Sequence, residues 1–281
     1  TMDPSSFKTI WMSATMEKEW LNTVDFCQSA KNLDIFSLTQ NDRECTGVKS
    51  RLSAPKTLKQ ASESNGNYKD LAKEILKKHN EDKAGTRTLV VLNTVKRAVE
   101  LHSALKRMHP DAHLILIHSR FRPPDRKLLV EDLIKKPDAL GTIIVSTQVV
   151  EAGVDISAKT LFTELAPWTS LVQRFGRCNR AGEYNSAEVY WIDLQTGIKS
   201  KAAPYSDEEL DEARKILVEH EQKSVGPKFL PKVSLPFIHE FVIRKKDLIE
   251  LFDTTTDLAG QDLDISRFIR ESSETNVQVF W

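Results

Sequence analysis

The sequence predicts an α/β protein built on a mostly parallel sheet flanked by helices. Short, continuous apolar runs alternate along the chain with amphipathic helical patterns, and polar residues directly follow several of the runs. A continuous apolar run is typical of a strand buried on both faces, as in a parallel sheet. Regular alternation of strands and helices favours right-handed crossover connections. The 281 residues are enough for a large hydrophobic core.

The strands of this sheet are predicted mainly after residue 87, where the pattern becomes regular. Thr94 can cap a first helix, and Pro123 and Pro124 open a second that ends before Pro137. Ser206 and Glu209 form a capping box for a helix that reaches about Lys223. The predicted strands are Thr88–Leu92, His113–Ile117, Thr142–Ser146, Thr160–Leu165 and Ala187–Leu194.

The two ends of the chain are less regular. Thr9–Thr15 reads as a short strand, and a helix is predicted over Glu17–Ser29, followed by weak strands. An apolar stripe predicts a further helix over Tyr68–Asn80. After Gly226 the pattern weakens, so we expect a small mixed appendage there.

The segment 171–182 contains three arginines and one glutamine in a short space. If it is a helix, Gln173, Arg177 and Arg180 share one face, while Leu171, Phe175 and Cys178 lie on roughly the opposite face. A focused pair of guanidiniums suits phosphate, because each presents a planar fork of donors. The alternative is a solvated basic helix face.

Composition limits the classes of function. The chain has 40 basic and 40 acidic residues, so any nucleic-acid interface must be a local feature. Three cysteines without a CxxC pair argue against a disulfide framework and fit a reducing, cytoplasmic location. No apolar run reaches membrane-spanning length, and we expect no metal-ligand set. His109 and His113 have ligand-like spacing, but Pro110 intervenes and a third ligand is missing.

Three motifs carry a resemblance to a known family. Ser13-Ala14-Thr15, the run 146–155 and the run 173–180 resemble motifs III, V and VI of superfamily 2 helicases, in that order. Details of the second and third motifs, together with His118–Phe121 and two tail segments, resemble the CRISPR-associated helicase–nuclease of type I systems. The tail segments are Asp247–Thr254 and Asp262–Ser266. The resemblance implies a RecA-like lobe and covers most of the chain from residue 9 onward.

The resemblance also implies roles toward ATP with Mg²⁺, which such helicases bind between two RecA-like lobes. Arg177 and Arg180 match arginine fingers that reach the γ-phosphate, and Gln173 matches a residue that contacts the nucleotide or the partner lobe. Gly153 and Asp155 match positions near the nucleotide, although Asp155 is alternatively the cap of a turn. Arg174 is assigned either to the nucleotide or to an ion pair between the lobes.

Other positions are implied to face single-stranded DNA or to couple hydrolysis to strand movement. The coupling residues are Ser13 and Thr15 of the first motif. Cys178, Trp168 and His118 are interpreted as structural. The implied nucleic-acid contacts are Asn93, Thr94, Ser119, Arg120, Thr147 and Gln148.

Several motifs of a complete enzyme are absent from the sequence. The chain has no Gly-Lys dipeptide for a Walker A loop, no DExH or DExD box after a strand, and no His-Asp dipeptide of the nuclease domain. We therefore expect the first lobe to hold most of the ATP and Mg²⁺, and this chain to be inactive alone. We also expect it to be an engineered or proteolytic fragment, or a natural piece of a split protein.

The leading hypothesis is the C-terminal helicase lobe of a prokaryotic, cytoplasmic, ATP-dependent translocase that unwinds DNA in CRISPR interference. Its expected partners are single-stranded DNA, the first RecA-like lobe, a nuclease domain and the CRISPR surveillance complex. We expect no membrane partner. The alternatives are a non-catalytic partner-binding or DNA-binding module, and a lobe of another superfamily 2 enzyme such as a DEAH-type RNA helicase. The expected domain ranges are 1–16 for the end of the first lobe, 17–84 for the entry segment, 85–225 for the second lobe and 226–281 for the appendage.

Overall fold

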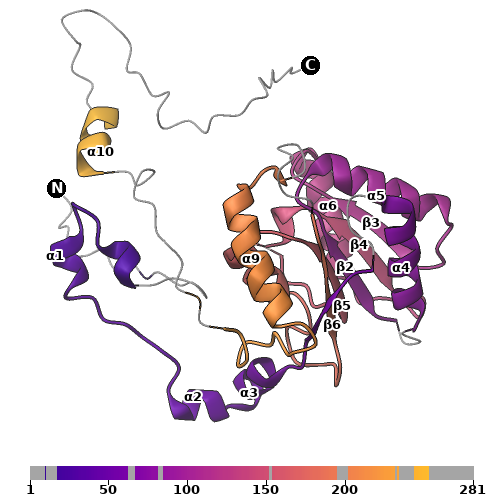
Figure 1. The fold of residues 1–281 in the computed structure, drawn as a ribbon, viewed down its shortest axis with the longest axis horizontal. Coiled ribbons are helices and arrows are strands. Elements are labelled where there is room, and N and C mark those ends of the chain that lie inside the picture. Colours follow the sequence, from indigo (N-terminus) through magenta and orange to yellow (C-terminus); the bar gives the residue numbers. More distant parts are fainter. Residues whose placement is uncertain are drawn as a thin grey trace, which may run out of the picture. The chain divides into compact units, whose positions relative to one another are not determined.

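The structure is a computed structural model, and the residues that it describes form two compact units. The sheet unit falls within residues 1–15 and 37–232, and the second unit within residues 16–36 and 233–281. Figure 1 shows the course of the chain. The described residues are 10, 18–62, 67–81, 85–151, 154–194, 202–231, 233 and 244–252.

The sheet unit is built on six parallel strands, which confirms the predicted fold class. The strand order is β1-β6-β5-β2-β4-β3, so β2 lies between β4 and β5 near the middle of the sheet. The three runs at β2, β4 and β5 are almost completely buried, as expected for strands covered on both faces. The strands are β1 Thr57–Gln60, β2 Arg87–Val91, β3 His113–Ile117, β4 Thr142–Ser146, β5 Thr160–Glu164 and β6 Glu188–Ile192.

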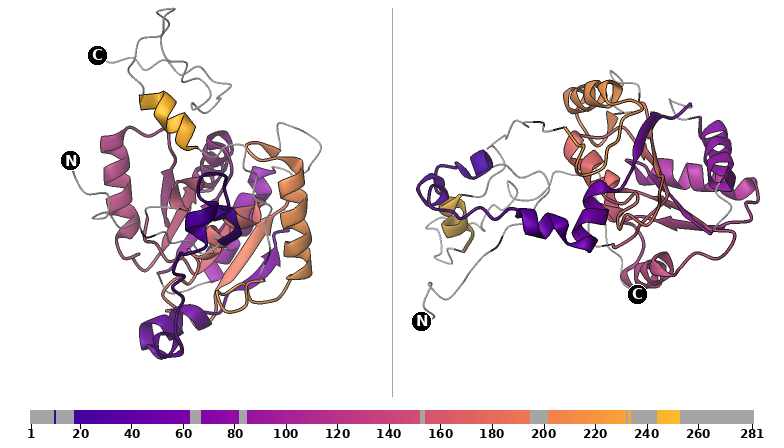
Figure 2. Two further views of the ribbon diagram at one scale, coloured as in Figure 1. Left: turned by 90° about the vertical axis from the view of Figure 1, so that its left-hand side faces the viewer. Right: turned by 90° about the horizontal axis from the view of Figure 1, so that it is seen from below.

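Helices cover both faces of this sheet. Helices α4 and α5 pack against each other and against the sheet, while α7 packs against β5 and α9. Figure 1 shows α9 on one side of the sheet and α4 on the other, and Figure 2 shows the layers from two further directions. The helices of this unit are α2 Gln40–Glu44, α3 Thr46–Ser53, α4 Tyr68–Glu81, α5 Val95–Arg107, α6 Pro123–Ile134, the short 3-10 helix η3 Gln148–Val150, α7 Trp168–Phe175 and α9 Asp207–Glu219.

The hydrophobic core lies between the sheet and the α4–α5 layer. Leu71, Ile75 and Leu101 from the two helices meet Val90 and Phe162 from the central strands, and all five are 3% exposed or less. Burial of a side chain of this size stabilises a fold by roughly 1.5–3 kcal/mol relative to exposure. The apolar helical stripes recognised in the sequence therefore hold the layer in place.

The predicted helix caps are confirmed. Thr94 Oγ1 accepts a hydrogen bond from the Arg97 amide at 3.3 Å, and Ser206 forms a reciprocal capping box with Glu209. Helix α9 ends at Glu219, earlier than predicted, because Gln222 adopts a left-handed φ of 61°. The residues that follow run beside β1, where the Leu58 amide donates to Lys223 O at 2.9 Å. The last turn predicted for this helix instead covers the outer edge of the sheet.

The prediction of one helix over Glu17–Ser29 is wrong. The structure has the 3-10 helix η2 at Lys18–Leu21 and the α-helix α1 at Cys27–Ala30, and both belong to the second unit. Asn22 and Thr23 separate them, and short polar side chains of this kind compete with helical backbone bonds. The second unit also contains α10 Lys245–Phe252.

The entry range 17–84 is more than a connection, because its second half supplies β1 and α4 to the sheet unit. Three predictions concern segments outside the described residues. These are the strand Thr9–Thr15 with its coupling residues Ser13 and Thr15, the nucleotide position Gly153, and the tail segment Asp262–Ser266.

Candidate functional site at the carboxyl edge of the sheet

The polar residues predicted at the strand ends meet at the carboxyl edge of the sheet. Because β2 pairs with both β4 and β5, the residues that follow these strands are neighbours. Gln148 Nε2 donates to Asn93 O at 2.8 Å, and Asn93 Nδ2 donates to Leu165 O at 2.7 Å. Segments far apart in the sequence thus form one connected polar edge, where ligands of open parallel sheets commonly bind.

Asn93 and Thr147 are buried, with 3% of each residue exposed. Their side chains therefore support the edge and do not present a surface to a nucleic acid. The prediction that they contact a strand directly is corrected in this respect. Thr94 and Gln148 are partly exposed, and Ser119 and Arg120 after β3 are exposed. These four residues remain candidates for direct contact with a ligand.

Arg174 lies at the centre of this edge and is completely buried, at 0% exposure. Its guanidinium makes five hydrogen bonds, which equals the number of its N–H donors. The acceptors are Glu151 Oε1 at 2.7 Å, Thr163 Oγ1 at 3.0 Å, Glu164 O at 3.1 Å, Asn93 Oδ1 at 3.0 Å and Tyr205 Oη at 3.4 Å. No N–H is left for a phosphate or for an acidic group of another lobe. Within this chain Arg174 therefore has a structural role, and its roles toward a nucleotide or another lobe stay predictions.

Glu164 adds a second buried ion pair to the edge. Its carboxylate accepts hydrogen bonds from the Asn93 amide at 2.7 Å and from Arg97 Nη1 at 3.2 Å. Burial raises the pKa of Glu164, while the Arg97 guanidinium and the Asn93 amide act in the opposite direction. The side chain is 3% exposed, so its charge depends on these partners.

The prediction of one continuous helix over the arginine segment is wrong. Helix α7 ends at Phe175 with Gly176 as its C-cap, and Arg177 and Arg180 lie in the turn that follows. We call residues 176–182 the arginine turn. Its backbone pairs with Ala158, whose amide donates to Arg177 O at 2.9 Å, and Asn179 adopts a left-handed φ of 43°. This pairing competes with further helical hydrogen bonds.

Arg177 and Arg180 are nevertheless brought together with the preceding motif. Arg177 Nη2 donates to Glu151 O at 2.6 Å, and Arg180 Nε pairs with Asp155 Oδ1 at 2.7 Å. Arg177 is 8% exposed, and its buried Nε has no hydrogen-bond partner within the described part of the chain. Burial and the nearby Arg180 lower the pKa of Arg177. The site thus holds two guanidiniums close enough to influence each other.

The remaining motif residues have different exposures. Gln173 is partly exposed on α7, and the Asp155 side chain is 84% exposed in its pair with Arg180. The Asp155 carboxylate pairs with Arg180, and it is exposed enough for a ligand to reach it. The structural interpretations of Cys178 and Trp168 are confirmed, since both are buried at 5% exposure or less.

Sequence reasoning missed two residues that support Arg174 and the end of α7. Tyr205, before α9, accepts hydrogen bonds from Arg174 and from Gln148 Nε2. Lys56, before β1, donates through Nζ to Phe175 O at 2.9 Å although it is only 2% exposed. Neither residue belongs to a periodic pattern or a motif in the sequence, so no local signal marks its role.

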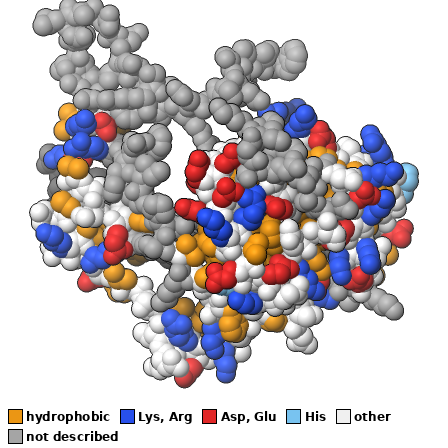
Figure 3. Space-filling model, viewed as in Figure 1, with side chains coloured by type: hydrophobic (Ala, Val, Ile, Leu, Met, Phe, Trp, Pro, Cys, Tyr) orange, Lys and Arg blue, Asp and Glu red, His pale blue; other side chains and the backbone are white. Residues whose placement is uncertain are grey.

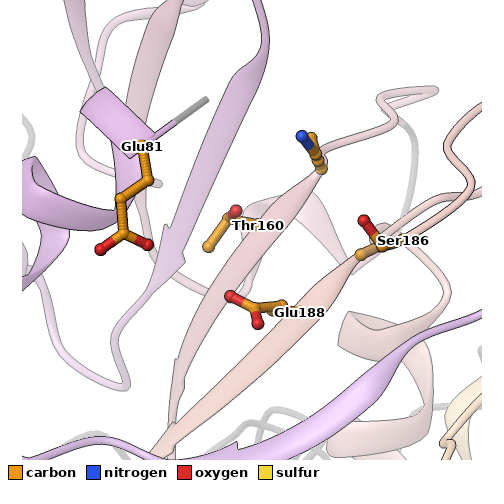
Figure 4. Close-up of a pocket in the computed structure, with 6 residues that line it drawn as sticks. Glu81, Thr160, Ser186 and Glu188 are labelled. Atoms are coloured by element: carbon orange, nitrogen blue, oxygen red, sulfur yellow. The ribbon is translucent and has the colours of Figure 1, made fainter. Parts of the chain in front are cut away.

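A small cavity of about 190 Å³ lies elsewhere, at the amino ends of β5 and β6. Figure 4 shows Glu81, Thr160, Ser186 and Glu188 around it, with Lys159 and Ala187 completing the lining. Cys178 of the arginine turn reaches the same end of the sheet, because its Sγ donates to Lys159 O and to Glu188 O, each at 3.7 Å. The cavity therefore lies beside the arginine turn and apart from the polar residues at the carboxyl ends of the strands.

Other features of the described residues do not point to a particular ligand. The described ranges hold no group of three or more His, Cys, Asp or Glu side chains arranged to bind a metal ion. Within those ranges, no helix combines the length and the apolar character that a membrane span requires. Basic and acidic side chains are interspersed on the face shown in Figure 3.

The six-stranded parallel sheet with helices on both faces is a RecA-like α/β fold. The fold agrees with the crystal structure of T. fusca Cas3-AMPPNP, with a TM-score of 0.55 and 19% identity over 66% of this chain and 24% of that chain. It also agrees with the crystal structure of a CRISPR-associated protein, with a TM-score of 0.56 and 19% identity over 78% of this chain and 25% of that chain.

The sequence comparisons show what part of the chain is similar to. Residues 84–183 match the family model described as "CRISPR-associated nuclease/helicase Cas3, C-terminal". The Haloferax volcanii CRISPR-associated nuclease/helicase Cas3 is 43% identical over 76 residues, which cover 26% of this chain and 8% of that protein. The putative CRISPR-associated nuclease/helicase Cas3 of Methanocaldococcus jannaschii is 33% identical over 131 residues, which cover 45% of this chain and 18% of that protein.

Residues 84–183 of the chain are thus similar to the C-terminal region of the CRISPR-associated nuclease/helicase Cas3. The matched range extends from just before β2 to just after the arginine turn and includes the site residues from Asn93 to Arg180. The matches span less than a fifth of the length of these two relatives.

Proposed function

We propose that this chain is the second RecA-like lobe of an ATP-dependent helicase that moves along single-stranded DNA in CRISPR interference. The observation that carries the proposal is the position of Arg177 and Arg180 on one turn, where their side chains lie beside Glu151 and Asp155 of the preceding motif. The matches to Cas3 sequences favour this function over that of a DEAH-type RNA helicase.

In this proposal Arg177 and Arg180 act as arginine fingers toward the γ-phosphate of ATP. The orphaned Nε of Arg177 and the adjacent Arg180 guanidinium fit a polyanion, because they are positive groups with unused donors. The Arg180–Asp155 pair is largely exposed, and such pairs contribute only about 0–1 kcal/mol, so a phosphate can replace the carboxylate at little cost. An arginine supplied from a second lobe accelerates phosphoryl transfer by roughly 10³–10⁵.

The nucleotide itself, with Mg²⁺, would be held mainly by the first lobe. When bound, it supplies the phosphoanhydride bond whose hydrolysis drives movement. The residues of this chain orient the arginine turn and present Gln173 and Asp155 toward the same region. The sequence contains no glycine-rich Walker A loop, and we therefore propose that the chain alone does not hydrolyse ATP.

For the DNA track we propose Thr94, Ser119, Arg120 and Gln148, which lie after β2, β3 and β4 and are exposed or partly exposed. The buried Asn93 and Thr147 would shape this edge from behind. The proposed partners are the first lobe, a nuclease domain and a CRISPR surveillance complex, and the proposed location is the prokaryotic cytoplasm. Balanced overall charge agrees with a local and not a global nucleic-acid interface.

The test is reconstitution of ATPase activity. The chain is mixed with a matching first lobe that carries the Walker A and DExD or DExH motifs, and ATP hydrolysis is measured with and without single-stranded DNA. We expect activity only in the mixture, reduced at least 10³-fold by Arg177→Ala. Arg122→Ala is the matched control, because Arg122 precedes α6 as its N-cap, is 82% exposed and pairs with Asp125 three residues away.

A non-catalytic binding module is the alternative outcome of this experiment. The chain could bind the first lobe or DNA tightly but show no ATPase activity in the mixture, with binding unchanged by Arg177→Ala. That result would favour a binding module over a helicase. Hydrolysis by the chain alone at a helicase-like rate would contradict the division of labour between the two lobes.

A further inference from the structure

A short segment before β1 is packed along the arginine turn. We call residues 50–56, which lead from the end of α3 into β1, the strap. Residues that follow α9 hold the strap by two backbone hydrogen bonds. The Val225 amide donates to Lys56 O at 2.8 Å, and the Lys228 amide donates to Leu52 O at 3.3 Å. The strap is therefore held firmly enough to position a neighbouring segment.

Two adjacent residues of the strap bracket Arg177. Lys56 Nζ donates to Phe175 O at 2.9 Å, and Asn179 Nδ2 donates to Pro55 O at 3.2 Å. Phe175 and Asn179 stand two residues before and two residues after Arg177. The dipeptide 55–56 thus ties both sides of the backbone that carries this guanidinium.

The strap also approaches the end of the turn very closely. Gly182 adopts a left-handed φ of 74°, and a Cβ atom there would lie 2.4 Å from Ser50 O. Only glycine permits this backbone contact without a shift of one segment. The strap consequently meets the end of α7 at Phe175 and the arginine turn at Asn179 and Gly182.

The lysine is an unusual residue for its position. Lys56 is 2% exposed, and transfer of an ammonium group into the interior is unfavourable unless the group is well bonded. Its location at the C-terminal end of α7 offers compensation, since the helix dipole places partial negative charge there. An apolar side chain would fill the volume but would release Phe175 O from the strap.

We propose that Lys56 is a positioning residue for Arg177, and that the strap sets the orientation of the arginine turn through Lys56 and Pro55. This inference rests on the proposed function, because it assigns to the strap the alignment of the proposed arginine finger. It also has a purely structural part, namely that the strap restrains the turn in this chain.

The structural part is tested by hydrogen–deuterium exchange on the full chain. Lys56→Met keeps the side-chain volume and removes the bond to Phe175 O, and Asn179→Gly removes the bond to Pro55 O while tolerating the left-handed φ. We expect amides of residues 176–182 to exchange roughly 10- to 10²-fold faster in either variant. Lys59→Met is the matched control, because Lys59 lies on β1 and its ammonium pairs with the Glu188 carboxylate and not with a backbone atom of the turn.

The catalytic part is tested in the reconstituted ATPase. We expect Lys56→Met to lower kcat by about 10-fold or more through misplacement of Arg177, with KM for ATP nearly unchanged. A merely destabilised lobe would instead lose active protein and melting temperature, so the thermal transition is measured in parallel. Lys59→Met should leave kcat unchanged.

Each result decides one part of the inference. If the amides of residues 176–182 exchange at the same rate in Lys56→Met and Lys59→Met, the strap does not restrain the arginine turn. If they exchange faster in Lys56→Met but kcat is unchanged, Lys56 does not position Arg177 for catalysis. A wild-type mixture that lacks ATPase activity overturns the proposed function and the catalytic part, while the exchange result still decides the restraint.

Discussion

Replacement of Arg174 by methionine is expected to be among the most destabilising single changes in the sheet unit. Methionine preserves much of the aliphatic volume, so the perturbation is mainly the loss of the guanidinium. That group makes five hydrogen bonds at 0% exposure and is ion-paired to Glu151 at 2.7 Å. The substitution strands buried acceptors on Asn93 and Thr163 and leaves a carboxylate without its partner.

The magnitude follows from these contacts. Removal of one partner of a buried pair costs about 3–5 kcal/mol, which is a large share of a typical folding free energy of about 5–15 kcal/mol. The Glu151 side chain is 17% exposed and can be partly rehydrated, so the lower half of that range is expected. Arg174→Lys should lose most of this energy too, because an ammonium cannot reproduce the planar fork of donors.

The assay is urea unfolding of the chain followed by tryptophan fluorescence. Trp168 and Trp191 are 5% and 1% exposed and report on the sheet unit. With a slope of about 2 kcal/mol per molar urea, a loss of 3 kcal/mol moves the midpoint down by roughly 1.5 M. Arg122→Met is the control and should change stability by less than about 1 kcal/mol, since its pair is exposed.

Two results would refute this reasoning. The first is a midpoint for Arg174→Met that equals the midpoint for Arg122→Met. The second comes from adding Glu151→Gln to Arg174→Met, which removes the stranded charge and should restore part of the lost stability. No recovery in the double variant would show that the carboxylate is not the source of the loss.

Three further outcomes are expected. Thiol titration of the native chain should modify Cys45 readily and leave Cys178 unmodified until a denaturant is added, because Cys178 is buried and Cys45 is exposed; modification of Cys178 in the folded chain would contradict the packing of the arginine turn. Burial raises the pKa of the Cys178 thiol from 9.0 to about 12. The protonated thiol therefore stabilises the fold fully below about pH 9, and this stabilisation is lost as the pH rises toward 12. The free energy of unfolding should decrease over this pH range, and Cys178→Ala should make the decrease smaller. Ser206→Ala should cost about 1 kcal/mol in unfolding free energy by removing the cap of α9, whereas an unchanged stability would indicate that tertiary packing alone defines this helix end.

The sequence predicted much of the fold because its signals are local and repetitive. Buried parallel strands require continuous apolar runs, and the runs at His113–Ile117 and Thr142–Ser146 coincide with β3 and β4. Cap residues such as Thr94 and Ser206 mark helix starts by a side-chain bond within the same turn. By contrast, the arginine segment has helical spacing to its end, yet pairing with Ala158 ends the helix at Phe175.

The sequence by itself determined the class of sheet, the order of its motifs and the set of charged residues within them. Tertiary structure alone decided which of those charges are available. Arg174, Arg177 and Arg180 look equivalent in the sequence, but five acceptors drawn from several segments saturate Arg174. Arg177 keeps an unbonded Nε within the described part of the chain, and the Arg180 side chain is exposed. Lys56 acquires its role only when the chain brings it against Phe175, 119 residues away. The physical reason is that desolvation and hydrogen-bond saturation depend on neighbours in space, which no local pattern encodes.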